Sequence, residues 1–152
     1  MRFCSSSIVL VVVLLLAGCR GEATNVLDSV RDTEVPKELV KKYVDDNTYI
    51  DIDVDVLLRS VVNQNGKSSV NEEDMAKMKA AVYRFYRHVS VKDGYYVCGI
   101  KKGSEINVSQ SVFRTLLENL NEINRMIKGA KDRGEAIDVQ IPDEEYLNSF
   151  LR

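Results

Sequence analysis

The chain has 152 residues, of which 45% are hydrophobic and 29% charged, and its formal net charge at pH 7 is −2. That length suits one domain with a short additional segment. A mildly acidic chain without a basic cluster carries no electrostatic signal for nucleic acid or for anionic lipid headgroups. We therefore expect no nucleic acid among its partners and no charge-driven membrane binding.

The N-terminal residues 1–18 have the three parts of a secretory signal peptide. Arg2 supplies a positive charge, an unbroken apolar run follows from Ile8 to Leu16, and small residues end the segment. The apolar stretch is shorter than the about 20 residues that a membrane-spanning helix requires. We therefore expect residues 1–18 to be removed from the mature protein.

The four residues Leu16-Ala17-Gly18-Cys19 resemble the lipobox of bacterial lipoproteins at every position. In that family a diacylglyceryl group is attached to the cysteine thiol, a signal peptidase cuts just before it, and the new amine is usually acylated. The resemblance covers only the first 19 residues. It implies a cell-envelope protein anchored to a membrane through lipid on Cys19, and two or more acyl chains anchor stably without a spanning helix. In such lipoproteins the absence of aspartate directly after the cysteine, where this chain has Arg20, indicates the outer membrane. Arg20-Gly21-Glu22 matches poorly the acidic motif that directs surface display in some of them, so we expect the periplasmic face.

The polar composition of residues 19–34 predicts a flexible tether, followed by a single domain over 35–152. The signal peptide removes one cysteine and lipid modifies Cys19, so only Cys98 remains and the domain has no internal disulfide. We interpret Cys98 as a small buried strand residue, because nothing in the sequence brings His88, the only histidine, close to its thiol.

Apolar residues at helical spacing predict two long helices. One spans 72–88 with Asn71 as its N-cap, and the other spans 110–132 with Ser109 as its N-cap. Two shorter helices, each opened by a proline, are expected at 36–46 and 142–151.

Alternating apolar and polar residues predict short strands. These are expected at 49–56, at 95–100 and 105–108 as a hairpin, and at 136–141. A short helix should follow the first strand, with Asp53 or Asp55 as its cap. The fold class that results is α+β, a small sheet of about three to four short strands with the two long amphipathic helices on one face, plus short helices.

Three carboxylates alternate along the first expected strand. Asp51, Asp53 and Asp55 would share one face of that strand and could bind a hard cation such as calcium. The alternative is a solvated polar face opposite a buried apolar one.

Aromatic and basic residues are concentrated between the end of the first long helix and the hairpin. Their composition is typical of a protein-contact patch, and the alternative is ordinary core edge and surface. The residues concerned are Tyr83, Arg84, Tyr86, Arg87, Tyr95 and Tyr96.

The sequence contains no Ser/His/Asp order, no phosphate-binding glycine loop and no ligand set for zinc, so we assign no catalytic, cofactor or metal residue. We expect a non-enzymatic, lipid-anchored envelope lipoprotein that binds another protein or supports an envelope assembly. The alternative is a periplasmic inhibitor or immunity-type lipoprotein. An enzyme with an unrecognised site, or a calcium-binding protein, is a third hypothesis.

Overall fold

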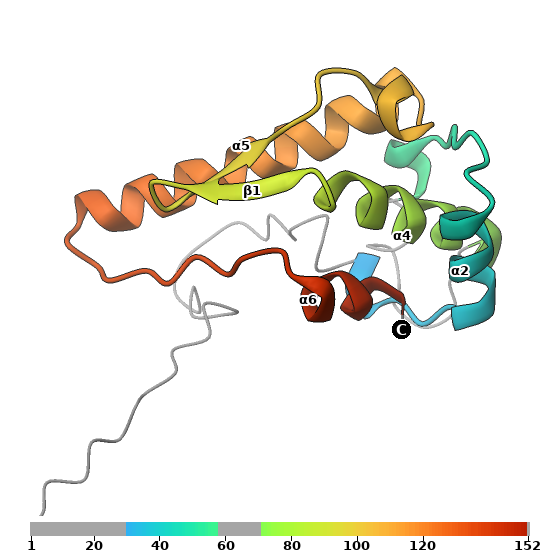
Figure 1. Ribbon diagram of the computed structural model, residues 1–152, viewed down its shortest axis with the longest axis horizontal. Helices are drawn as coiled ribbons and strands as arrows, with labels where there is room; N and C mark the ends of the chain where they lie inside the picture. The colour runs from blue at the N-terminus through green and yellow to red at the C-terminus, as the bar shows by residue number, and fades with distance from the viewer. Residues whose placement is uncertain (1–29, 58–70, 152) are drawn as a thin grey trace, which may run out of the picture.

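The computed structural model describes residues 30–57 and 71–151 as helices joined to one small hairpin (Figure 1). In chain order the elements are α2 (Lys37–Asp45), α4 (Glu72–Tyr86), β1 (Val89–Lys92), β2 (Tyr95–Cys98), the 3₁₀-helix η1 (Gly103–Ile106), α5 (Gln110–Asp132), α6 (Glu144–Asn148) and the 3₁₀-helix η2 (Ser149–Leu151). The α+β class is confirmed at this level.

The main core forms around α4, which contacts α2, the first part of α5, and the C-terminal α6 and η2. Its stripe of Met75, Met78, Val82 and Phe85 is completely buried. Phe85 packs edge-on against Phe113 of α5, with ring centroids 5.9 Å apart. Because burial of each such side chain contributes about 1.5–3 kcal/mol, this cluster is the main source of stability.

The long helices begin where their capping residues predict. The Asn71 side chain accepts a hydrogen bond from the Glu73 amide at 3.0 Å, and the Ser109 hydroxyl accepts one from the Val112 amide at 3.2 Å. Helix α5 has the predicted bounds, whereas α4 ends at Tyr86 and not at His88. The reason is that Val89, which also fits the helical stripe, begins strand β1 instead.

The sheet has two antiparallel strands in the described part of the chain, with Lys92 opposite Tyr95 and Val89 opposite Cys98. Asp93 and Gly94 both have positive φ, at 53° and 73°, as a two-residue hairpin turn requires. The predicted hairpin of 95–100 with 105–108 is therefore wrong. β2 pairs backwards with β1, and residues 103–106 form η1.

The expected three to four strands are also wrong at 49–56 and 136–141. Ile50 makes only an isolated parallel bridge to Val108, and residues 54–57 are a helical turn whose Val56 amide is capped by the Asp53 carboxylate at 3.0 Å. Residues 135–143 run back along the hairpin without regular structure (Figure 1). Alternation correctly predicted that Ile50, Ile52 and Val54 are buried, but burial of alternate residues does not require a strand partner.

The packed domain begins earlier than the expected boundary at residue 35. Val30 is completely buried in the main core, and the Arg31 guanidinium carbon lies 5.6 Å from the Tyr146 ring and 5.2 Å from the Phe150 ring. The Lys79 ammonium donates to the Arg31 carbonyl at 3.4 Å. The segment after residue 29 is thus fixed between α4 and the C-terminal helices. Residues 30–34, which the composition assigned to the tether, therefore belong to the packed domain.

Candidate functional site

The predicted aromatic and basic patch does not form one surface. Arg84 and Tyr86 are buried, so the expectation that they contact a partner is wrong. Tyr83, Tyr95 and Tyr96 are half-buried and Arg87 is exposed. The patch therefore divides into a structural part inside the domain and a smaller part on the hairpin.

Arg84 joins three loop and helix ends through backbone carbonyls. One guanidinium nitrogen, Nη1, donates to the carbonyls of Thr48, Ile106 and Asn107 at 2.8, 3.2 and 3.3 Å, and Nη2 donates to the carbonyl of Tyr43. Burial lowers the pKa of Arg84 from its usual value, although an arginine remains charged in proteins. Four carbonyls, including one in the last turn of α2, compensate this buried charge. The role of Arg84 is to hold the fold together.

Tyr86 belongs to an aromatic cluster between α4 and the C-terminus. Its ring centroid lies 5.7 Å from that of Tyr146 and 6.2 Å from that of Phe150. Such aromatic contacts contribute to the core beyond their buried area. Tyr86 therefore anchors α6 and η2 to α4.

The hairpin has a covered inner face and an open outer face. On its outer face Ser90, Lys92 and Val97 are exposed and Tyr95 is half-buried, with the exposed Arg87 and His88 just before β1. Val97 is an apolar side chain that is 43% exposed. We call these six residues the hairpin surface.

Helix α5 holds the tip of the hairpin in place. The Lys131 ammonium donates to the carbonyls of Asp93 and Gly94 at 3.3 and 3.0 Å and lies 4.0 Å from the centroid of the Tyr95 ring. On the inner face the Tyr96 hydroxyl donates to the Gln140 carbonyl at 2.9 Å, and burial raises the pKa of this tyrosine. The hairpin surface is therefore presented on a fixed support.

The three aspartates that could bind calcium lie beside an open cleft of about 470 Å³. Its lining consists of Asp51, Ile52, Asp53, Val54, Asp55, Ser111 and Thr115. Among residues 30–57 and 71–151, no three His, Cys, Asp or Glu side chains are grouped closely enough to hold a metal ion. This argues against the calcium hypothesis at these residues, and Asp53 is instead a helix cap.

Cys98 lies on the inner face of β2 and is half-buried. Its thiol donates to the Ile100 carbonyl at 3.5 Å, and burial raises its pKa, which keeps the sulfur protonated. The hairpin brings His88 alongside, since the Gly99 amide donates to the His88 carbonyl at 2.7 Å. This contact joins backbone atoms, and the Cys98 thiol bonds to the Ile100 carbonyl and not to the imidazole of His88. The geometry therefore does not show Cys98 activated as a nucleophile by His88.

Known proteins add no assignment, because comparison with protein families, curated proteins and solved structures finds no match for this chain. Within the described ranges no helix combines the length and apolar composition needed to cross a bilayer. The predicted signal peptide and Cys19 lie outside those ranges.

Proposed function

We propose that this protein is an envelope lipoprotein, anchored through lipid on Cys19, whose domain binds another protein through the hairpin surface. The lipobox resemblance of residues 16–19 supports the anchor. The hairpin surface supports the binding role.

The observation that carries the binding role is the exposure of Val97 beside Tyr95 and Lys92. An exposed apolar strand residue next to an aromatic ring and cations has the composition of a protein-contact site. Since Lys131 fixes the hairpin tip, little ordering entropy would be lost when a partner binds.

The anchor is tested by substituting Cys19→Ala in the full chain and following lipid labelling and processing in the native host. We expect an unprocessed, unlabelled precursor. Cys4→Ala is the matched control and should be labelled and processed like the unmodified chain. Normal cleavage and lipid labelling of the Cys19→Ala chain would refute the anchor.

The binding role is tested with a photo-crosslinking residue at position 97 in the native host. Position 126 is the matched control, because Met126 is 51% exposed and apolar but lies on α5. We expect a discrete protein adduct from position 97 that position 126 does not give. An adduct with one soluble enzyme would favour the inhibitor-type alternative. The absence of an adduct from position 97 would contradict the binding role.

A further inference from the structure

The two edges of the hairpin are treated differently. At the β2 edge the side chain of Asn124, from α5, takes the place of a neighbouring strand. Its Oδ1 accepts from the Tyr96 amide at 2.8 Å, and its Nδ2 donates to the Tyr96 carbonyl at 2.8 Å. One side chain thus satisfies the outward amide and carbonyl of Tyr96 on β2.

The β1 edge has no equivalent cover in the described chain. The Gly99 amide donates to the His88 carbonyl at 2.7 Å, so this pair is of the hydrogen-bonded type. Pair types alternate along an antiparallel ladder, so Val91 opposite Tyr96 is a non-hydrogen-bonded pair. The amide and carbonyl of Val91 therefore point away from β2, and no hydrogen bond from the described residues reaches them.

Cations outnumber acidic residues along this edge. Arg87, His88 and Lys92 are exposed, and Asp93 at the turn is the only acidic residue from Arg87 to Gly99. Glu105 of η1 is an acidic residue on a neighbouring element, and its pKa is lowered chiefly by hydrogen bonds from the amides of Lys101 and Lys102. Apart from Asp93 at the turn, this edge is thus bordered by the cations Arg87 and Lys92.

We propose that the β1 edge binds an extended segment of a partner protein whose residues alternate between apolar and acidic. This rests on the proposed protein-binding function and names its partner chemistry. The segment would pair with the amide and carbonyl of Val91, as in strand addition to an exposed sheet edge. Its apolar side chains would lie on the face of Val89 and Val91, and its carboxylates would lie near Lys92 on the outer face.

The experiment uses the full chain, purified with its lipid in detergent, and two fluorescent six-residue peptides. One peptide alternates valine and glutamate, and the other alternates valine and lysine. Fluorescence anisotropy should show saturable binding of the glutamate peptide, about tenfold or more tighter than binding of the lysine peptide. Equal binding of the two peptides, or no saturable binding, would overturn the proposal.

Two variants separate backbone pairing from charge. Val91→Pro removes the outward amide but leaves the β1–β2 ladder intact, because proline is tolerated on an edge strand, and it should weaken glutamate-peptide binding about tenfold. Lys92→Glu should shift the preference towards the lysine peptide. Lys41→Glu, at an exposed position on α2, makes the same charge change elsewhere and should leave the preference unchanged.

The remaining outcomes also decide. Unchanged binding by Val91→Pro, with an unchanged far-ultraviolet circular dichroism spectrum, would refute strand addition. A dimer in size-exclusion chromatography that Val91→Pro abolishes would make a second copy the occupant. If crosslinking at position 97 finds a partner but the peptides do not bind, the proposed function stands and the β1 edge fails. If the peptides bind selectively but no adduct forms, the edge stands and the cellular function fails.

Discussion

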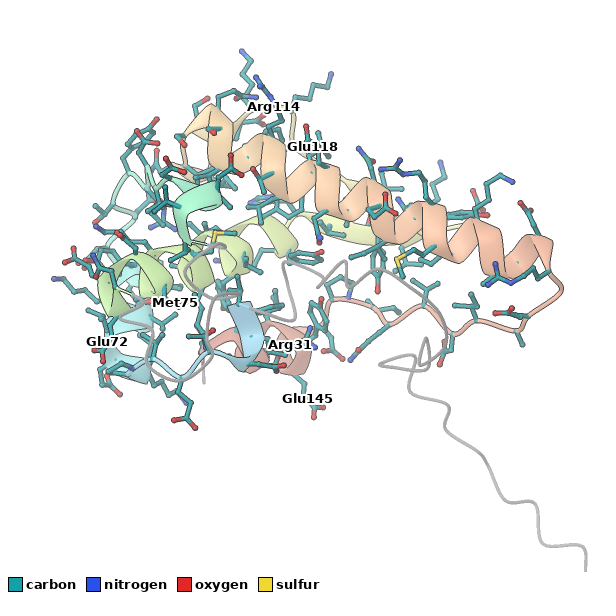
Figure 2. All side chains as sticks on the ribbon, turned by 180° about the vertical axis from the view of Figure 1, so that it is seen from behind. Arg31, Glu72, Met75, Arg114, Glu118 and Glu145 are labelled. Atoms are coloured by element: carbon teal, nitrogen blue, oxygen red, sulfur yellow. The ribbon has the colours of Figure 1, made fainter. Side chains whose placement is uncertain are left out.

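The helical body and the arm of this molecule are stabilised in different ways. The body comprises α2, α4, the first half of α5, α6 and η2. The arm comprises α5 from Asn121 onward, the hairpin and residues 135–141, and it extends away from α2 and α4 (Figure 1). Figure 2 shows the same division from behind, with Arg114 and Glu118 of α5 at the body end and the arm beyond them.

The body is a packed core, whereas the arm depends largely on directional polar contacts. Beyond Val89 only Ile127 and Ala130 are buried in the described arm, and neither belongs to the main core. The arm is instead fastened by Asn124 and Lys131. Because the arm is held by hydrogen bonds, it can expose backbone and apolar groups at its surface. The packed body supplies most of the free energy of unfolding.

The largest effect is expected for Arg84→Met in the body. It leaves carbonyls at three places without their donor, and at about 1–3 kcal/mol for each buried group we expect a loss of about 3–5 kcal/mol. Urea unfolding measures this loss. The control is Arg87→Met, at an exposed residue directly after α4, and it should change the free energy of unfolding by less than about 0.5 kcal/mol. Equal effects of the two substitutions would show that the carbonyl contacts contribute little.

Truncation of a core residue should cost more in the body than in the arm. Leu116→Ala should lower the free energy of unfolding by about 3–4 kcal/mol, and Ile127→Ala by about 2 kcal/mol, since its cavity opens towards solvent. Thermal and urea unfolding of both variants provide the comparison. A larger loss from Ile127→Ala would remove the distinction between body and arm.

Removal of the amide at Asn124 should affect the arm alone. Asn124→Leu leaves the Tyr96 amide and carbonyl without partners, and we expect a loss of about 1–2 kcal/mol. Hydrogen exchange should become faster at the hairpin amides and remain unchanged in α4. Asn124→Asp can still accept from Tyr96 but cannot donate to it, so its loss should be intermediate. Faster exchange throughout α4 would show that the arm and the body unfold together.

The smallest effect is a pH dependence in the body. Hydrogen bonds from Lys77 and the Tyr43 hydroxyl lower the pKa of Glu73. The ionised form is therefore favoured by folding, and its contribution is present at neutral pH and lost as pH falls through the lowered pKa. The Tm of the unmodified chain should fall more between pH 7 and about pH 3 than that of Glu73→Gln. Parallel Tm profiles would remove this contribution.

Local signals predicted the helices, and the missing information was long-range. The side-chain caps at Asn71 and Ser109 and the apolar stripes determine where α4 and α5 begin. The strand partners could not be predicted in the same way, because Ile50 and Ile52 alternate in burial against helices without joining a ladder. Asp-Gly at 93–94 is a typical hairpin-turn pair, but the strand before it could not be recognised, because Val89 also fits the apolar stripe of the preceding helix.

The candidate site was predicted only in part for a similar reason. An arginine near the end of a helix usually indicates surface, and Arg84 has no carboxylate partner that a sequence pattern could reveal. The sequence signal that could have indicated burial of Arg84 is the pair Ala80 and Ala81, one turn earlier. Both are completely buried, so the buried face of α4 is broader than its stripe of large apolar residues. Arg87 and Tyr95 remained at the surface, since they lie where the chain leaves the core.

In the proposed lipoprotein, the burial of Val30 limits the length of the tether between the membrane and the domain. Residues 20–29 separate Cys19, the proposed site of lipid attachment, from the packed segment, and a fully extended chain of that length reaches at most about 40 Å. Because Arg31 lies against Tyr146 and Phe150, the tether would join the domain next to α6 and η2. A binding partner would therefore have to contact the domain close to the membrane surface, within the reach of this short tether.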